Sequence, residues 1–102
     1  MYKSFEFNFE WDPAKAASNY KKHGVTFERA ATVFNDPRAL TIYDEEHSGD
    51  EDRWITVGLN VDTFFVIINH TYREKNGGTA YIRIISARKA TNKEIKQYKE
   101  TI

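Results

Sequence analysis

Cysteine is absent from the 102-residue chain, which excludes disulfide bridges, thiolate metal ligands and thiol redox chemistry. Long apolar runs are absent too, since no stretch approaches the roughly 20 apolar residues that a membrane-spanning helix needs. The aromatic and acidic first residues lack the basic start and apolar run of a signal peptide. Because this length suits one compact core, we expect a single domain over residues 1–102, soluble and cytoplasmic, with no membrane partner.

Common enzyme signatures are missing as well. The chain has no phosphate-binding glycine loop, no nucleophile elbow and no HExxH zinc motif. The loop Asp44–Asp52 holds His47 among acidic residues, but its spacing is not that of a calcium-binding loop. We therefore expect neither a metal nor another cofactor. Acid–base chemistry assisted by arginine remains open, as does the absence of any catalysis.

The net charge is zero, but the charges are unevenly distributed along the chain. Residues 37–60 contain two basic and six acidic side chains, whereas residues 61–102 contain eight basic and four acidic ones. A neutral protein can therefore present a locally cationic surface to an anionic partner. Ordinary solvated charge explains the same pattern, so charge alone does not decide the matter.

The first part of the chain predicts one strand and two short helices. Aromatic and polar residues alternate over residues 5–11, which is typical of a half-buried strand. Asp12-Pro13 is a favourable helix start, and His23-Gly24 is a favourable helix end. Thr26 caps a second helix, which Asn35-Asp36-Pro37 terminates. The two helices form an αα-hairpin.

The second part predicts four strands and a last helix. Short loops with turn residues favour antiparallel neighbours over crossovers. Thr91 and Glu94 form a capping box for the last helix, whose apolar stripe is Ile95, Tyr98 and Ile102. The predicted fold is α+β: an N-terminal strand, an αα-hairpin, a four-stranded antiparallel meander and a C-terminal helix. The helices cover one face and leave the other free for function. The predicted meander strands are Ala39–Tyr43, Trp54–Leu59, Phe64–Thr71 and Ala80–Ala87.

Arginines at the predicted strands and strand ends are the main candidates for an anion site. A guanidinium offers several planar donors to phosphate, and neighbouring aromatic rings stack on unpaired bases. Salt bridges to Glu51 or Glu74 on an exposed strand edge explain the same arginines without a ligand. The candidate arginines are Arg53, Arg73, Arg83 and Arg88, and the candidate aromatics are Trp54, Tyr72 and Tyr81.

The register of the last hairpin decides which of these residues meet. A turn centred on Asn76-Gly77 places His70 opposite Arg83, whereas a shift by one residue places His70 with Ile84 and Ser86. A histidine in an apolar strand is more often structural than functional. Arg83 and Arg88 are five positions apart, so a regular strand points them to opposite faces unless it bulges. We therefore take Arg83 and His70 as the primary pair.

Long strings of this sequence resemble the BrnT family, the toxins of a bacterial type II toxin–antitoxin system. The opening string FEWDPAKAASNYKKHGVTFERAATVFNDP runs from Phe9 to Pro37. The strings ALTIYDEEHSGDEDRWITVG, INHTYR and RIISARKAT follow in the family's order, so that the resemblance covers nearly the whole chain. It implies a RelE-like fold and a ribonuclease toxin that inhibits translation. It also implies a BrnA-like antitoxin with a ribbon-helix-helix part, through which the pair binds its operator DNA.

A metal-independent ribonuclease needs a base for the 2′-hydroxyl, cations for the phosphorane and an acid for the leaving 5′-oxygen. As a hypothesis, Arg83 and Arg88 bind the phosphate with support from Arg53 and Arg73. His70 or Glu51 is the base, and the other of the two or a tyrosine is the acid. Cleavage would leave a 2′,3′-cyclic phosphate and a 5′-hydroxyl.

Lys22 and His23 lie within the matching KHG string and would add cations, although a cation at a helix end is also favoured by the helix dipole. Two other hypotheses stay open: a non-catalytic RNA- or protein-binding module, and a metal nuclease that uses the loop Asp44–Asp52.

Overall fold

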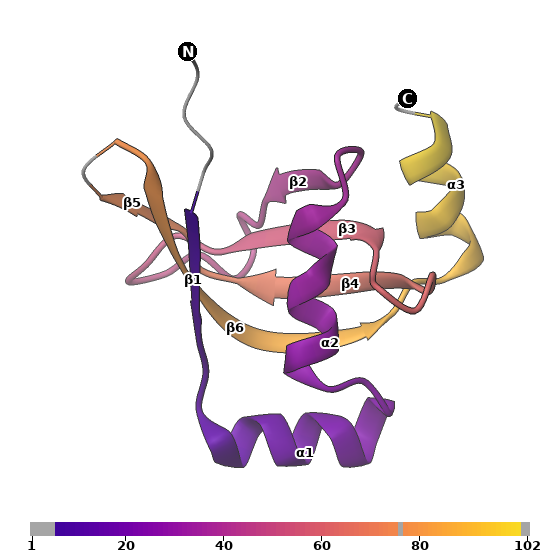
Figure 1. Cartoon of the computed structure of the whole chain (residues 1–102), viewed down its shortest axis with the longest axis horizontal. Coiled ribbons are helices and arrows are strands. Elements are labelled where there is room, and N and C mark those ends of the chain that lie inside the picture. Colours follow the sequence, from indigo (N-terminus) through magenta and orange to yellow (C-terminus); the bar gives the residue numbers. More distant parts are fainter. Residues whose placement is uncertain (1–5, 76, 101–102) are drawn as a thin grey trace.

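The computed structural model describes residues 6–75 and 77–100, which form a six-stranded sheet with helices on both faces (Figure 1). Phe5, Asn76 and Ile102, which took part in the predictions above, lie outside the described residues. The elements are β1 (Glu6–Glu10), α1 (Pro13–His23), α2 (Phe27–Ala31), the 3₁₀ helix η1 (Thr32–Asn35), β2 (Leu40–Tyr43), β3 (Trp54–Leu59), β4 (Phe65–His70), β5 (Arg73–Lys75), β6 (Thr79–Lys89) and α3 (Asn92–Glu100).

The long strand β6 organises the sheet, whose order is β1-β6-β4-β3-β2. Its first half lies between β1, which runs parallel to it, and the short β5, which runs antiparallel. Its second half pairs antiparallel with β4, and β3 and β2 follow by further antiparallel pairing. The α+β class agrees with the prediction. The parallel β1–β6 pair and the separate strand β5 are features that sequence patterns did not indicate.

Helices α1 and α2 cover one face of the sheet because their caps and apolar positions act together. The Asp12 carboxylate accepts the Ala14 N–H at 2.8 Å, and Gly24 ends α1 in the left-handed conformation. In α2, Phe27 and Ala30 are fully buried against Ile82 and other residues of β4 and β6. None of the described helices is long and apolar enough to cross a membrane.

A buried asparagine fastens α1 to β6. The Asn19 side chain donates to the Ala87 carbonyl at 2.8 Å and accepts the Ala87 N–H at 3.1 Å. It also donates to the Val25 carbonyl at 3.2 Å, which follows the end of the helix. These three bonds satisfy a polar group that would otherwise be costly to bury.

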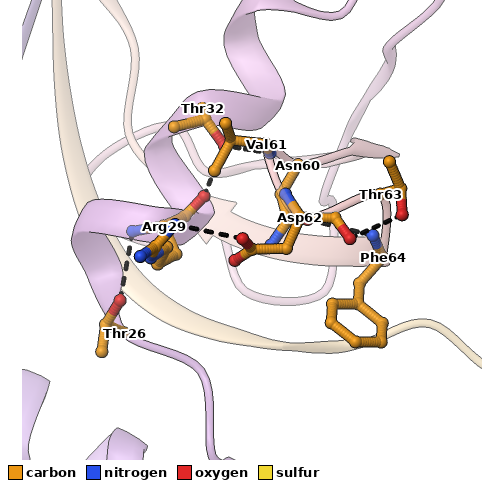
Figure 2. A network of polar contacts seen from close by, with 8 residues as sticks. All are labelled: Thr26, Arg29, Thr32, Asn60, Val61, Asp62, Thr63 and Phe64. Atoms are coloured by element: carbon orange, nitrogen blue, oxygen red, sulfur yellow. Dashed lines mark hydrogen bonds and ion pairs between the residues drawn. The ribbon is translucent and has the colours of Figure 1, made fainter.

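The turn between β3 and β4 is held against α2 and η1 by the polar network in Figure 2. The Arg29 guanidinium donates to Asp62 at 3.0 Å, and the Thr32 hydroxyl accepts the Val61 N–H at 2.8 Å. Within the turn, the Asn60 side-chain oxygen accepts the N–H groups of Asp62 and Phe64, both at 3.0 Å. The turn is therefore fixed to the helical layer at two points.

Helix α3 lies on the opposite face of the sheet from α1 and α2, which corrects the prediction that one face is free. Tyr98 is buried there with Val57 and Ile67, and its ring centroid lies 5.2 Å from that of Phe65. The prediction failed because the apolar stripe of α3 does not say which face it covers. The predicted capping box is confirmed, since the Glu94 carboxylate accepts the Thr91 N–H at 2.8 Å.

A β-bulge sets the register between β4 and β6. Asn69 lies opposite Ser86 and His70 lies opposite Ile84, so Ile85 is an extra residue on β6. The predicted pairing of His70 with Arg83 is therefore wrong. Of the alternative partners, Ile84 agrees with the structure, whereas Ser86 lies opposite Asn69. The reason lies in the β5–β6 pairing: Lys75 lies opposite Thr79 and Arg73 opposite Tyr81, which is already one residue away from the predicted register.

Candidate functional site

A polar cleft of about 320 Å³ lies beside the start of β6, next to β5 and the end of the acidic loop. It brings together five residues that the sequence predicted as functional. Three further residues of the lining, Glu10, Asp52 and Thr71, were not predicted. The five predicted residues are Glu51, Tyr72, Arg73, Tyr81 and Arg83.

The regular alternation of β6 places Tyr81 and Arg83 in the cleft. Their neighbours Ile82 and Ile84 are buried in the core on the other face, so these two side chains point away from α1 and α2. Arg73 lies opposite Tyr81 across the β5–β6 pair, and its guanidinium carbon is 5.7 Å from the centre of the tyrosine ring. This distance is that of a cation–π contact.

Thr71 fixes the backbone where β4 gives way to β5. Its N–H donates to the Arg83 carbonyl at 3.0 Å, and its hydroxyl accepts the Arg83 N–H at 3.3 Å. The backbone that carries the Arg83 side chain is therefore held from the neighbouring segment. A rigid strand positions a functional group better than a loop does.

The end of the acidic loop reaches across to Arg83. The Glu51 carboxylate forms an ion pair with the Arg83 guanidinium, and the Arg53 guanidinium lies 4.0 Å from the same carboxylate. The Ser48 hydroxyl, which accepts the Arg53 N–H at 2.9 Å, closes the loop. A carboxylate beside two guanidiniums, half exposed to solvent, supplies both a proton acceptor and donors for an oxyanion.

Arg88 shares the outward face of β6 with Arg83, because the bulge at Ile85 restores the alternation. Its guanidinium is nevertheless bound to both Glu94 oxygens at 2.8 Å. The hydrogen bond to Glu94 raises the pKa of Arg88, and the same bond lowers the pKa of Glu94 to about 2. The structure therefore joins Arg88 to α3 and separates it from the cleft.

His70 lies on the opposite face of the sheet from Arg83 and is fully buried. Its Nδ1 contacts the Thr71 carbonyl at 2.9 Å and its Nε2 contacts the Thr56 hydroxyl at 2.7 Å. Burial lowers the pKa of His70, while the bond to Thr71 opposes the shift. The predicted pair of Arg83 and His70 is thus divided between two faces, although His70 touches the segment that fixes Arg83.

The remaining predicted residues lie elsewhere. Trp54 lies opposite His70 on β4 and lines a second pocket with it. Lys22 and His23 form the last turn of α1, where the helix dipole favours cations, and neither lines the cleft. In the loop proposed for a metal, His47 Nδ1 is bound to Asp44 at 2.8 Å. Residues 6–75 and 77–100 contain no group of three side chains placed to hold a metal ion.

Of the three lining residues that were not predicted, the sequence offers a reason to include only some. Thr71 lies within the INHTYR string, between His70 and Tyr72, which were both predicted. Glu10 reaches the cleft because β1 pairs in parallel with β6, which places it beside Arg83. That pairing joins residues more than 70 positions apart, and a period of two in β1 does not identify its neighbour.

The structure is a small α+β fold, and its polar cleft brings two arginines together with three carboxylates. A family model described as the ribonuclease toxin BrnT of a type II toxin–antitoxin system matches residues 11–94, so the chain belongs to this family. The predicted family and the toxin's ribonuclease function are thereby confirmed, and membership implies an antitoxin and an RNA substrate.

The fold is similar to the crystal structure of the Brucella abortus ribonuclease toxin BrnT, with a TM-score of 0.56. The sequence identity is 17%, and the similarity covers 89% of this chain and 100% of that chain. At this identity the likeness supports the fold alone. No curated protein matches the chain.

Proposed function

We propose that this ribonuclease toxin is a metal-independent endoribonuclease whose active site is the cleft between β5, β6 and the acidic loop. The observation that carries the proposal is the Glu51–Arg83 ion pair, which lines the same cleft as Arg73 and two tyrosines. A carboxylate, guanidiniums and phenols supply the base, the phosphate donors and the acid that RNA cleavage needs. His70, Arg88, Lys22 and His23 have no direct role in this proposal.

In the proposed reaction, Arg83 and Arg73 bind the scissile phosphate, and Arg53 adds positive charge at Glu51. The Glu51 carboxylate takes the proton of the 2′-hydroxyl, and the 2′-oxygen attacks phosphorus. The bond from phosphorus to the 5′-oxygen breaks as Tyr81 donates its phenolic proton to that oxygen. The products are a 2′,3′-cyclic phosphate and a 5′-hydroxyl, while Glu51 has gained one proton and Tyr81 has lost one.

Transcript cleavage and growth arrest test the site. Arg83→Ala and Glu51→Gln should each reduce cleavage by about 100-fold or more, since each removes a group that acts in the transition state. Arg29→Ala is a matched control, because Arg29 is an exposed arginine in an ion pair outside the cleft. If folded Arg83→Ala cuts RNA as fast as the parent, the proposed site is wrong.

Binding measurements separate catalysis from sequestration. Glu51→Gln removes the negative charge beside Arg83, so it should bind RNA more tightly while cutting it more slowly. The parent protein should retain its activity with a chelator present, and the released 5′ ends should carry hydroxyl groups. Tight RNA binding without cleavage would instead favour the non-catalytic binding module.

We also propose a BrnA-like antitoxin with a ribbon-helix-helix part as the partner, a cytoplasmic location and a RelE-like arrangement of the fold. The family description supports the partner, since a type II system pairs a protein toxin with a protein antitoxin. Purification of the chain together with the product of its neighbouring gene tests this proposal. The complex, and not the toxin alone, should bind the operator DNA.

A further inference from the structure

A second pocket, of about 450 Å³, lies on the face of the sheet that carries η1. Its walls are mainly aromatic and include Phe7, Phe34, Trp54 and Tyr72. The volume falls within the roughly 300–1,000 Å³ of typical small-molecule sites, which are mostly apolar with a few placed polar groups. The polar groups here come from Thr41, Thr56, His70 and Asp36.

Hydrogen bonds connect the Thr71 carbonyl, His70, Thr56 and Thr41 in a chain, and the donor of each bond can be assigned. A carbonyl only accepts, so the contact with Thr71 places the proton of the imidazole on His70 Nδ1. In the neutral ring Nε2 is then an acceptor, and Thr56 must donate its hydroxyl proton to it. Thr56 has no second proton, so in the 2.7 Å contact between the two threonines Thr41 is the donor.

The chain therefore ends at the Thr41 oxygen, which retains lone pairs and has already used its proton. Thr41 is exposed, unlike Thr56 and His70, so its oxygen can meet a ligand. The Asp36 carboxylate is a second acceptor at the same pocket. Burial disfavours its charge, but hydrogen bonds from the Leu59 and Arg38 N–H groups prevail and lower the pKa of Asp36. A matching ligand should accordingly bring hydrogen-bond donors.

Tyr72 lines both this pocket and the polar cleft. The two hollows lie on opposite faces of the sheet and meet at this side chain, one apolar and aromatic, the other carrying Arg73 and Arg83. A nucleotide has the same division between a flat base and an anionic phosphate. Stacking on aromatic rings is the usual way in which proteins hold unpaired bases.

We propose that the aromatic pocket binds an unpaired base of the RNA whose phosphate lies in the cleft, and that Thr41 selects bases that carry an amino group. This inference rests on the proposed function and adds a subsite to it. Adenine, cytosine and guanine carry an exocyclic amino group, which donates to the Thr41 oxygen, whereas uracil and thymine carry none. Tyr72 stacks at the boundary between the two hollows.

The test uses the purified full-length chain and fluorescein-labelled trinucleotides of deoxyadenosine, deoxycytidine or thymidine, which lack the 2′-hydroxyl and cannot be cleaved by its attack. The parent should bind the amino-bearing trinucleotides more tightly than trithymidine. Thr41→Val should weaken binding of the amino-bearing ones by about 2- to 10-fold and remove the preference. Tyr72→Ala should weaken all of them by about 5- to 100-fold.

Three variants make the result specific. Thr41→Ser keeps the hydroxyl and should keep the preference, whereas Tyr72→Phe keeps the ring and should bind like the parent. Tyr20→Ala removes another exposed aromatic, which lies outside the pocket, and should change nothing. Circular dichroism confirms that each variant is folded.

The outcomes distinguish the subsite from the active site. If Arg83→Ala abolishes cleavage while Thr41→Val and Tyr72→Ala leave affinity and preference unchanged, the base pocket is refuted and the active site stands. If the threonine and tyrosine variants behave as expected but Arg83→Ala cleaves normally, the active site is refuted and the base pocket stands. A parent protein that binds none of the trinucleotides, or shows no preference, refutes the base pocket.

Discussion

Replacement of Glu94 by glutamine should destabilise the fold and leave the cleft intact. The carboxylate binds the Arg88 guanidinium through both oxygens and also accepts the Thr91 N–H. It thereby connects the end of β6 to the first turn of α3. Glutamine keeps the size of the side chain and one acceptor, so the variant removes mainly the charge.

The magnitude follows from the pKa of Glu94, which falls from 4.5 to about 2, chiefly because of the hydrogen bond from Arg88. At about 1.4 kcal/mol for each unit of pKa, this difference sets an upper limit of roughly 3 kcal/mol. The Arg88 side chain is 41% exposed, so water screens the pair. We therefore expect a loss of about 1–2 kcal/mol in the free energy of unfolding at pH 7.

The pH dependence has a defined sign. Because the folded-state pKa of Glu94 is the lower one, its contribution is complete above pH 4.5 and is lost as the pH falls toward about 2. Urea unfolding at pH 7 and at pH 3 measures the change. The difference between the parent and Glu94→Gln should be largest at pH 7 and should shrink at pH 3.

A double-mutant cycle with Arg88→Met isolates the pair, because neighbouring groups in one network do not act additively. Folded Arg88→Met should retain RNA cleavage, since Arg88 does not line the cleft. Two results would refute the reasoning: an unchanged stability in Glu94→Gln at pH 7, or a large loss of cleavage in a fully folded Arg88→Met protein.

Three further predictions concern stability and are measured by urea unfolding. Gly58→Ala should cost about 1–3 kcal/mol from overpacking, because its Cβ would lie 3.0 Å from both Asp36 Oδ2 and Val33 Cγ1. Gly49→Ala is its control, since nothing lies within 4 Å of the added Cβ. Thr56→Val should cost about 1–3 kcal/mol by leaving the buried acceptor of His70 without its donor. Because burial lowers the pKa of His70 below 6.5, the unfolded chain takes up the proton first, and stability should fall as the pH drops below 6.5. That slope between pH 7 and pH 5 should be smaller in His70→Asn, and an unchanged slope would contradict the assignment.

Features that depend on neighbours in the sequence could be predicted. Asp12 caps α1, Gly24 ends it, and Thr26 caps α2, each through contacts within a few residues. The capping box at Thr91 is of the same kind. In each case the residue type satisfies a backbone group that the helix end leaves open, so local chemistry determines the structure.

Features that depend on pairing between distant segments could not be predicted from one sequence. The bulge at Ile85 changes which residues of β6 lie opposite β4. No residue type in RIISARKAT indicates a bulge at this position. The contact between Glu51 and Arg83 joins positions 32 apart, and it requires that the acidic loop fold back over β6. The residue types of the cleft were therefore predictable, but their grouping was not.

Two ion pairs lie on the outer face of β6, and the proposed RNA site of this protein of zero net charge uses one of them. Glu94 engages Arg88 for the fold, while Glu51 engages Arg83 in the cleft, where both side chains are close to half exposed. In the proposed mechanism a phosphate must displace Glu51 from Arg83 before it can bind. The same displacement frees the Glu51 carboxylate to accept the 2′-hydroxyl proton, so substrate binding and base release become one event. A weak general affinity for RNA then follows, because the cations are paired until a phosphate competes for them.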